Sequence, residues 1–150
     1  MDAASSNGPG KQLEGYSALE YILLGDLRDL LEEQPPDEET CRWLVVVLDA
    51  LLETLPRELN LKEQDGYLSE VLESYPNWSD QVDRLRAEHE AVFADLQRLR
   101  GQIERRTTFA EIADEVRRGL RDWMLAVIAY HRHEKRLVQT AVNLEIGVGD

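Results

Sequence analysis

The sequence predicts an all-α protein folded as an antiparallel four-helix bundle with up-down-up-down topology. In four long segments, apolar residues recur at three- and four-residue steps, which is the period of a helix with one buried face. Short breaks separate these segments, and the first two contain proline. No segment alternates apolar and polar residues as a half-buried strand does, so helices packed on helices are expected.

The first two helices are expected on either side of a proline turn. The first should run from Ser17 to Glu33, because Ser17-Ala-Leu-Glu20 matches a capping box, and Gln34-Pro35-Pro36 should end it. Asp37 should cap the second helix, which continues with a kink at Pro56. The apolar residues expected on the inner faces of these helices are Leu19, Leu23, Leu27, Leu30, Leu31, Trp43, Leu44, Leu48, Leu51, Leu52 and Leu55.

The third helix should cover Val82 to Ile103, with a cap at Asn77 or Ser79. The fourth should begin at the capping box Thr108-Phe-Ala-Glu111 and run to about Asn143. The apolar residues expected on their inner faces are Val82, Leu85, Val92, Phe93, Leu96, Leu99, Ile103, Phe109, Ile112, Val116, Leu120, Trp123, Val127, Leu137 and Ala141.

Length and composition favour one domain without a membrane or nucleic-acid partner. Residues 17–145 are expected to form the bundle, residues 1–16 a disordered leader, and residues 146–150, with two glycines, a C-terminal tail. The net charge of −13 repels phosphate backbones, and no apolar run is long enough to cross a bilayer. The single cysteine, Cys41, excludes an intrachain disulfide and favours a cytoplasmic location.

Several polar residues fall on the stripes that should be buried. They are Glu58 and Lys62 on the second helix, His89 on the third, and Tyr130 and Glu134 on the fourth. Burying a polar group without a partner is costly, so these side chains should meet one another, a metal or a ligand. Helix bundles build metal sites from histidine and carboxylate side chains on facing helices, so a metal centre is one interpretation.

Three segments of the chain resemble the hemerythrin-like (HHE cation-binding) family. They are LETLPRELNLKEQDGYLSEVLE, LRAEHEAVFADLQRL and HEKRLVQTAVNLEIGVGD, and the resemblance covers about Leu19 to Asp150. It implies a four-helix bundle with a non-haem di-iron centre, used for oxygen binding, sensing or iron handling. The implied ligands are histidines on all four helices and bridging carboxylates on the second and fourth.

On the first two helices this sequence departs from the ligand pattern that the resemblance implies. The ligand histidine of the first helix falls on Leu27, which cannot bind iron. The histidine of the second helix falls on Glu58. The carboxylate that follows it falls on Lys62, although Glu63 is adjacent.

The last two helices keep more of that pattern. His89 matches the histidine of the third helix, and Phe93 stands where a second one is possible. On the fourth helix the histidine falls on Tyr130 and the carboxylate is kept as Glu134, while His131 is one position out of phase.

These departures favour a bundle that has lost the di-iron site and holds no cofactor. An ammonium inside a metal shell repels the cation, so Lys62 is expected to pair with Glu58 and Glu134, with His89 and Tyr130 completing a polar network. The protein would then be a non-enzymatic structural, regulatory or interaction module with an unidentified protein partner.

The alternative is a reduced metal site for oxygen or redox sensing or for iron handling. Its candidate ligands to non-haem iron, zinc or manganese are His89, Glu58, Glu63, Glu134 and His131. An enzyme that uses this metal for redox chemistry is a third, weaker interpretation. An ammonium of Lys62 between Glu58 and Glu134 would favour the metal-free cluster, whereas Lys62 in solvent and Glu63 turned inward would favour a metal.

Overall fold

The computed structural model describes residues 9–64, 66–106 and 108–149, and every element of secondary structure in these ranges is helical. The all-α prediction is therefore confirmed. The elements are α2 (Pro9–Glu32), α3 (Glu38–Gln64), α4 (Tyr67–Ser74), the 3₁₀ helix η1 (Pro76–Trp78), α5 (Ser79–Glu104) and α6 (Phe109–Gly149). None of the helices described is long and apolar enough to cross a bilayer.

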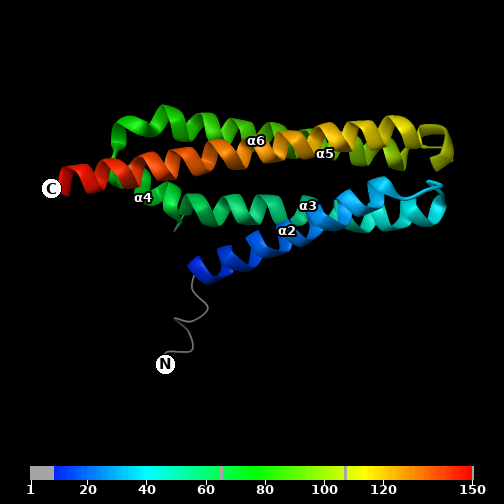
Figure 1. The fold of residues 1–150 in the computed structure, drawn as a ribbon, viewed down its shortest axis with the longest axis horizontal. Coiled ribbons are helices and arrows are strands. Elements are labelled where there is room, and N and C mark those ends of the chain that lie inside the picture. The colour runs from blue at the N-terminus through cyan, green and yellow to red at the C-terminus, as the bar shows by residue number, and fades with distance from the viewer. Residues whose placement is uncertain (1–8, 65, 107, 150) are drawn as a thin grey trace, which may run out of the picture.

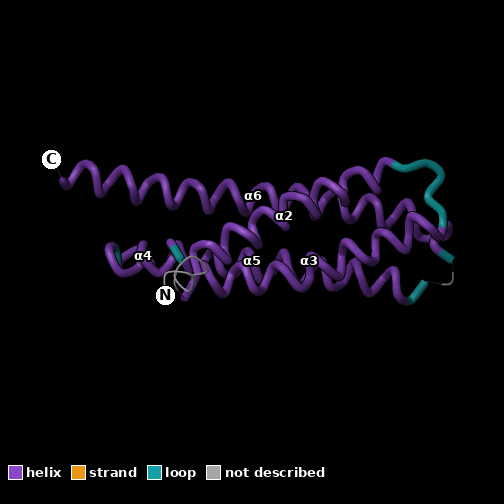
Figure 2. The backbone as a smooth tube through the Cα atoms, turned by 90° about the horizontal axis from the view of Figure 1, so that it is seen from below, coloured by secondary structure: helices purple, strands orange, loops and turns teal. Residues whose placement is uncertain are grey.

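The four long helices lie along one common direction. α2 packs along α3, and α5 packs along α6 (Figure 1). The α2–α3 turn and the α5–α6 turn lie at one end of the molecule, whereas α4 and the C-terminal end lie at the other (Figure 2). The short helix α4 therefore covers the end of the bundle at which α3 finishes and α5 begins.

The buried apolar residues form two clusters. The main core joins all four long helices and includes Leu27, Leu48, Leu96 and Trp123. The smaller cluster joins α4 to α5 and α6. Its members are Leu68, Val71, Val82, Leu85, Tyr130, Leu137 and Ala141. The polar residues predicted in the interior lie at the junction of the two clusters.

Both ends of the chain are more helical than expected. α2 begins at Pro9, so the prediction of a disordered leader is wrong for residues 9–16, and Ser17 lies inside the helix instead of capping it. Proline fits the first turn of a helix, where its missing N–H is not needed. α6 continues to Gly149, because a glycine costs only about 1 kcal/mol in a helix and does not forbid one. Residues 1–8 and 150 lie outside the described ranges.

The predicted helix starts are correct in part. Asp37 Oδ1 accepts a hydrogen bond of 2.9 Å from the Thr40 N–H, as an N-cap residue should. At α5, Trp78 occupies the N-cap position and no side chain caps the helix, so the expected cap by Asn77 or Ser79 is wrong. At α6, the Phe109 N–H donates to Glu38 Oε1 at 2.9 Å, which ties the starts of α3 and α6 together.

Two residues assigned to the core are exposed instead. Leu19 is 40% exposed and Trp43 is 57% exposed. In α2 the buried line runs through Glu20, Leu23 and Leu27, and Leu19 lies one position to its side. Trp43 lies in the first turns of α3, where the neighbouring residues Cys41 and Leu44 take the inner positions.

The C-terminal end of α2 is held by a buried arginine that the sequence analysis did not identify. Arg117 of α6 donates to the Leu31 carbonyl from Nε (3.1 Å) and Nη2 (2.6 Å), and to the Glu33 carbonyl from Nη2 (3.0 Å). Arg121 adds a hydrogen bond of 2.9 Å to Leu31. The last carbonyls of a helix lack intrahelical partners and carry partial negative charge, so a guanidinium suits them well.

Replacing this arginine should loosen α2. Arg117→Met removes three hydrogen bonds from a charged donor to buried carbonyls, so we expect the free energy of unfolding in urea to fall by about 1.5–3 kcal/mol. Arg118→Met, at an exposed position next in the chain, is the matched control and should change it by less than about 0.5 kcal/mol. Equal stability of the two variants would show that Arg117 does not hold α2.

Candidate functional site

Charged and polar side chains from all four long helices and from α4 meet at the junction of the two apolar clusters. We call this group the interior cluster. Its members are Glu20 of α2, Glu58 and Lys62 of α3, Tyr67 of α4, His89 of α5, and Tyr130, His131 and Glu134 of α6.

Lys62 is the central cation of the interior cluster. Its side chain is 3% exposed, because α3 continues through Pro56 and carries its buried face on to Glu58 and Lys62. Lys62 Nζ lies 2.6 Å from Glu134 Oε2 and 3.0 Å from Glu58 Oε1. The ammonium also lies 5.4 Å from the centre of the Tyr130 ring, within the range of a cation–π contact. An ammonium so buried must be paired, and the two carboxylates pair it.

Glu134 is the best-satisfied carboxylate of the interior cluster. Besides Lys62, its Oε2 accepts hydrogen bonds from the hydroxyls of Tyr67 and of Tyr130, the latter at 3.3 Å. Burial disfavours its charge, but the contacts with His131, Lys62 and Tyr67 outweigh burial and lower the pKa of Glu134 to about 2. Burial and this carboxylate together raise the pKa of both tyrosines, which therefore remain hydrogen-bond donors.

His131 links α6 to α2 through the interior cluster. Its Nδ1 lies 3.3 Å from Glu134 Oε1, and its Nε2 lies 2.8 Å from Glu20 Oε2. The second contact has the distance of an ion pair but not the direction of a hydrogen bond. Burial disfavours the imidazolium, yet the contacts with Glu134 and Glu20 outweigh it and raise the pKa of His131 to about 9. His131 is therefore a cation at neutral pH.

Glu58 and His89 are less well satisfied than their neighbours. Among the described side chains, neither Glu58 Oε2 nor His89 Nε2 has a hydrogen-bond partner, although both atoms are buried. Burial raises the pKa of Glu58, and this effect outweighs the opposing effect of the Lys62 ammonium 3.0 Å away. Burial and the charge of Lys62 lower the pKa of His89, whose neutral ring packs against Tyr130 with centroids 5.3 Å apart.

The residues predicted to form a polar network do not all make the expected contacts. Lys62 contacts Glu58, Glu134 and the Tyr130 ring, whereas His89 contacts Tyr130 only through its ring. Glu63, a candidate ligand, is partly exposed and bonds to Arg86 of α5.

Two members of the interior cluster were missed by the sequence analysis. Glu20 was assigned to a capping box, yet its spacing to Leu23 and Leu27 places it on the buried stripe of α2, and this signal could have revealed it. No helical spacing in the sequence marks Tyr67 as a member of the interior cluster. Tyr67 reaches Glu134 because α4 folds back over the end of the bundle after Gly66.

The donor set of the interior cluster does not fit a di-iron centre. The carboxylate oxygens that a metal would need are 2.6 and 3.0 Å from an ammonium, and Leu27 is fully buried in the apolar core. Within residues 9–64, 66–106 and 108–149, no group of three or more histidine, cysteine, aspartate or glutamate side chains is placed to hold a metal ion. The arrangement is that of an internal ion-pair network.

Removing the central cation of the interior cluster should destabilise the fold. Lys62→Met leaves Glu58 and Glu134 buried without their ammonium, so we expect the free energy of unfolding at pH 7 to fall by about 3–5 kcal/mol. Lys135→Met, at an exposed site, is the matched control. The triple variant Lys62→Met, Glu58→Gln, Glu134→Gln should recover part of the loss. A Lys62→Met variant as stable as the wild type would rule out a paired interior cation.

The charge on His131 should make stability depend on pH. Its pKa is higher in the folded chain, about 9, than the ordinary value of 6.5, so its contribution is complete below pH 6.5 and is lost as the pH rises through 9. The side chain is 34% exposed and partly screened, so we expect this contribution to be on the order of 1 kcal/mol.

The measurement is urea unfolding from pH 5.5 to 10 of the wild type and of His131→Gln. The difference between their unfolding free energies should shrink as the pH rises. Arg132→Gln, at an exposed position next in the chain whose side chain does not titrate in this range, should keep the wild-type slope. A difference that stays constant with pH would contradict a charged His131.

Comparison of the chain with protein-family models, with curated proteins and with solved structures found no match.

Proposed function

We propose that this protein is a metal-independent, hemerythrin-like bundle with up-down-up-down topology that serves as a non-enzymatic structural, regulatory or interaction module. One observation carries the proposal. The Lys62 ammonium lies where the resemblance implies a bridging carboxylate of a di-iron centre, and it contacts both Glu58 and Glu134. A protein cation there supplies the positive charge that a metal would otherwise provide.

The position of Glu63 supports the same proposal. A reduced metal site needs a carboxylate to replace the one lost at position 62, and Glu63 is the adjacent candidate. Glu63 bonds to Arg86 on the neighbouring helix and is partly exposed. Glu63 is therefore not available as a ligand in the oxygen-rich shell expected for a reduced metal site.

A reduced metal site remains the second candidate, and one observation favours it. His89 Nε2 and Glu58 Oε2 are buried and lack hydrogen-bond partners within the described part of the chain, and the lowered pKa of His89 keeps its ring in the neutral form that binds metals. These two groups could supply a nitrogen and an oxygen donor. The nearby charge of Lys62 opposes the binding of a cation.

Elemental analysis separates the two candidates. Protein expressed in iron-supplemented medium and purified without chelator or affinity metal should contain far less than one iron, zinc or manganese ion per chain. Its thermal unfolding should be the same with and without EDTA, because no folding energy would come from a metal. One or two tightly bound ions per chain that disappear in His89→Ala would refute the metal-independent proposal and support the second candidate.

A further inference from the structure

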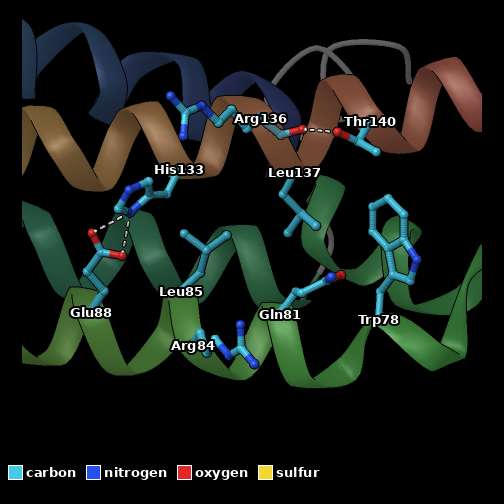
Figure 3. A pocket seen from close by; sticks show the side chains of 9 residues that line it. All are labelled: Trp78, Gln81, Arg84, Leu85, Glu88, His133, Arg136, Leu137 and Thr140. Carbon is cyan, nitrogen blue, oxygen red and sulfur yellow. Dashed lines mark hydrogen bonds and ion pairs between the residues drawn. The ribbon is translucent and has the colours of Figure 1, made fainter.

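A cavity of about 460 Å³ lies between the first half of α5 and the last part of α6. It is separate from the interior cluster and plays no part in the proposed function. Cavities of a few hundred cubic ångströms are the size at which proteins bind small organic molecules. The walls of this cavity indicate which class of molecule fits (Figure 3).

The inner wall of the cavity is apolar. Leu85 of α5 and Leu137 of α6 point toward one another across the helix seam (Figure 3). Trp78 stands at one end, where it stacks on Tyr75 with ring centroids 5.5 Å apart. An apolar body placed here would leave water and contact leucine and indole surfaces, which favours binding.

The opposite end of the cavity is closed by a bridge between the two helices. His133 Nδ1 of α6 lies 3.0 Å from both carboxylate oxygens of Glu88 on α5 (Figure 3). Glu88 of α5 follows Trp78, the last residue of η1, by ten residues, which is about 15 Å at the rise of an α-helix. The short distance between these two ends suits a short molecule.

Two arginines give the cavity its charge. Arg84 of α5 and Arg136 of α6 line it, and neither guanidinium has an ion-pair partner in the part of the chain that the structure describes. Arg86, Arg98 and Arg100, in contrast, each face a carboxylate. Unpaired arginines beside an apolar wall, in a chain of net charge −13, complement a carboxylate ligand.

We propose that this cavity binds a small organic acid, with its carboxylate at the open rim, where Arg84 and Arg136 stand on opposite sides of the seam (Figure 3), and its acyl or aromatic body on Leu85, Leu137 and Trp78. The apolar wall supplies affinity and the arginines supply selectivity for an anion. The Glu88–His133 bridge sets the length of the molecule that fits.

Isothermal titration of the full chain with decanoate and with 2-naphthoate, below any micelle concentration, tests the proposal. At least one acid should bind at one site per chain. Decanol, without the charge, should bind at least tenfold more weakly, and shortening the acyl chain should weaken binding about fourfold for each buried methylene. Tighter binding of decanoate identifies an acyl ligand, and tighter binding of 2-naphthoate identifies an aromatic one.

Matched charge variants localise the binding. Arg84→Gln with Arg136→Gln should weaken binding about tenfold or more. Arg118→Gln with Arg132→Gln removes the same charge from exposed positions of α6 and should leave the affinity unchanged. Failure of both acids to bind saturably, equal affinity for decanol, or equal losses in the two double variants would overturn the proposal.

Discussion

The buried ammonium of Lys62 is the constraint on which the interior of this bundle depends. A cation that is 3% exposed needs compensating charge, and it takes that charge from α3 itself through Glu58 and from α6 through Glu134. Glu134 in turn accepts the hydroxyl of Tyr67, so the same carboxylate positions α4. The contacts of this one ammonium and its carboxylate therefore help to orient α3, α4 and α6. Apolar contacts, which are interchangeable, would orient these helices less specifically.

The charges of the interior cluster do not balance one to one. Lys62 and His131 are cations, whereas Glu20, Glu58 and Glu134 are three carboxyls. Glu134 contacts both cations and Glu20 contacts His131, which leaves Glu58 to share Lys62 with a closer competitor. Burial raises the pKa of Glu58, and its Oε2 has no hydrogen-bond partner among the residues that the structure describes. Glu58 is thus a weakly compensated carboxylate of the cluster.

Helical periodicity was enough to predict the class of fold and most of the core, since the stripe through Leu85, His89 and Val92 is buried as expected. It also placed Lys62 inside, where tertiary contacts then pair it. The burial of Glu20 was not predicted, because Glu20 also fits a capping motif near a helix start, although it lies on the buried stripe of α2. Helical periodicity could not find Tyr67 or Arg117, since their partners are 67 residues or more away in the chain and local patterns carry no such information.

α2 illustrates how the remaining polar contacts complement the apolar core. Its apolar stripe, which includes Leu23, Leu27 and Leu31, is buried in the main core. Two polar contacts from α6 add to this packing. Arg117 holds the C-terminal end of α2 through the Leu31 carbonyl. His131 contacts the Glu20 carboxylate, which lies more than two helical turns closer to the N-terminus of α2 than Leu31. Of these, only the contact at His131 depends on a proton that is lost near pH 9, whereas the guanidinium of Arg117 stays charged and holds its end of α2 at any pH in this range.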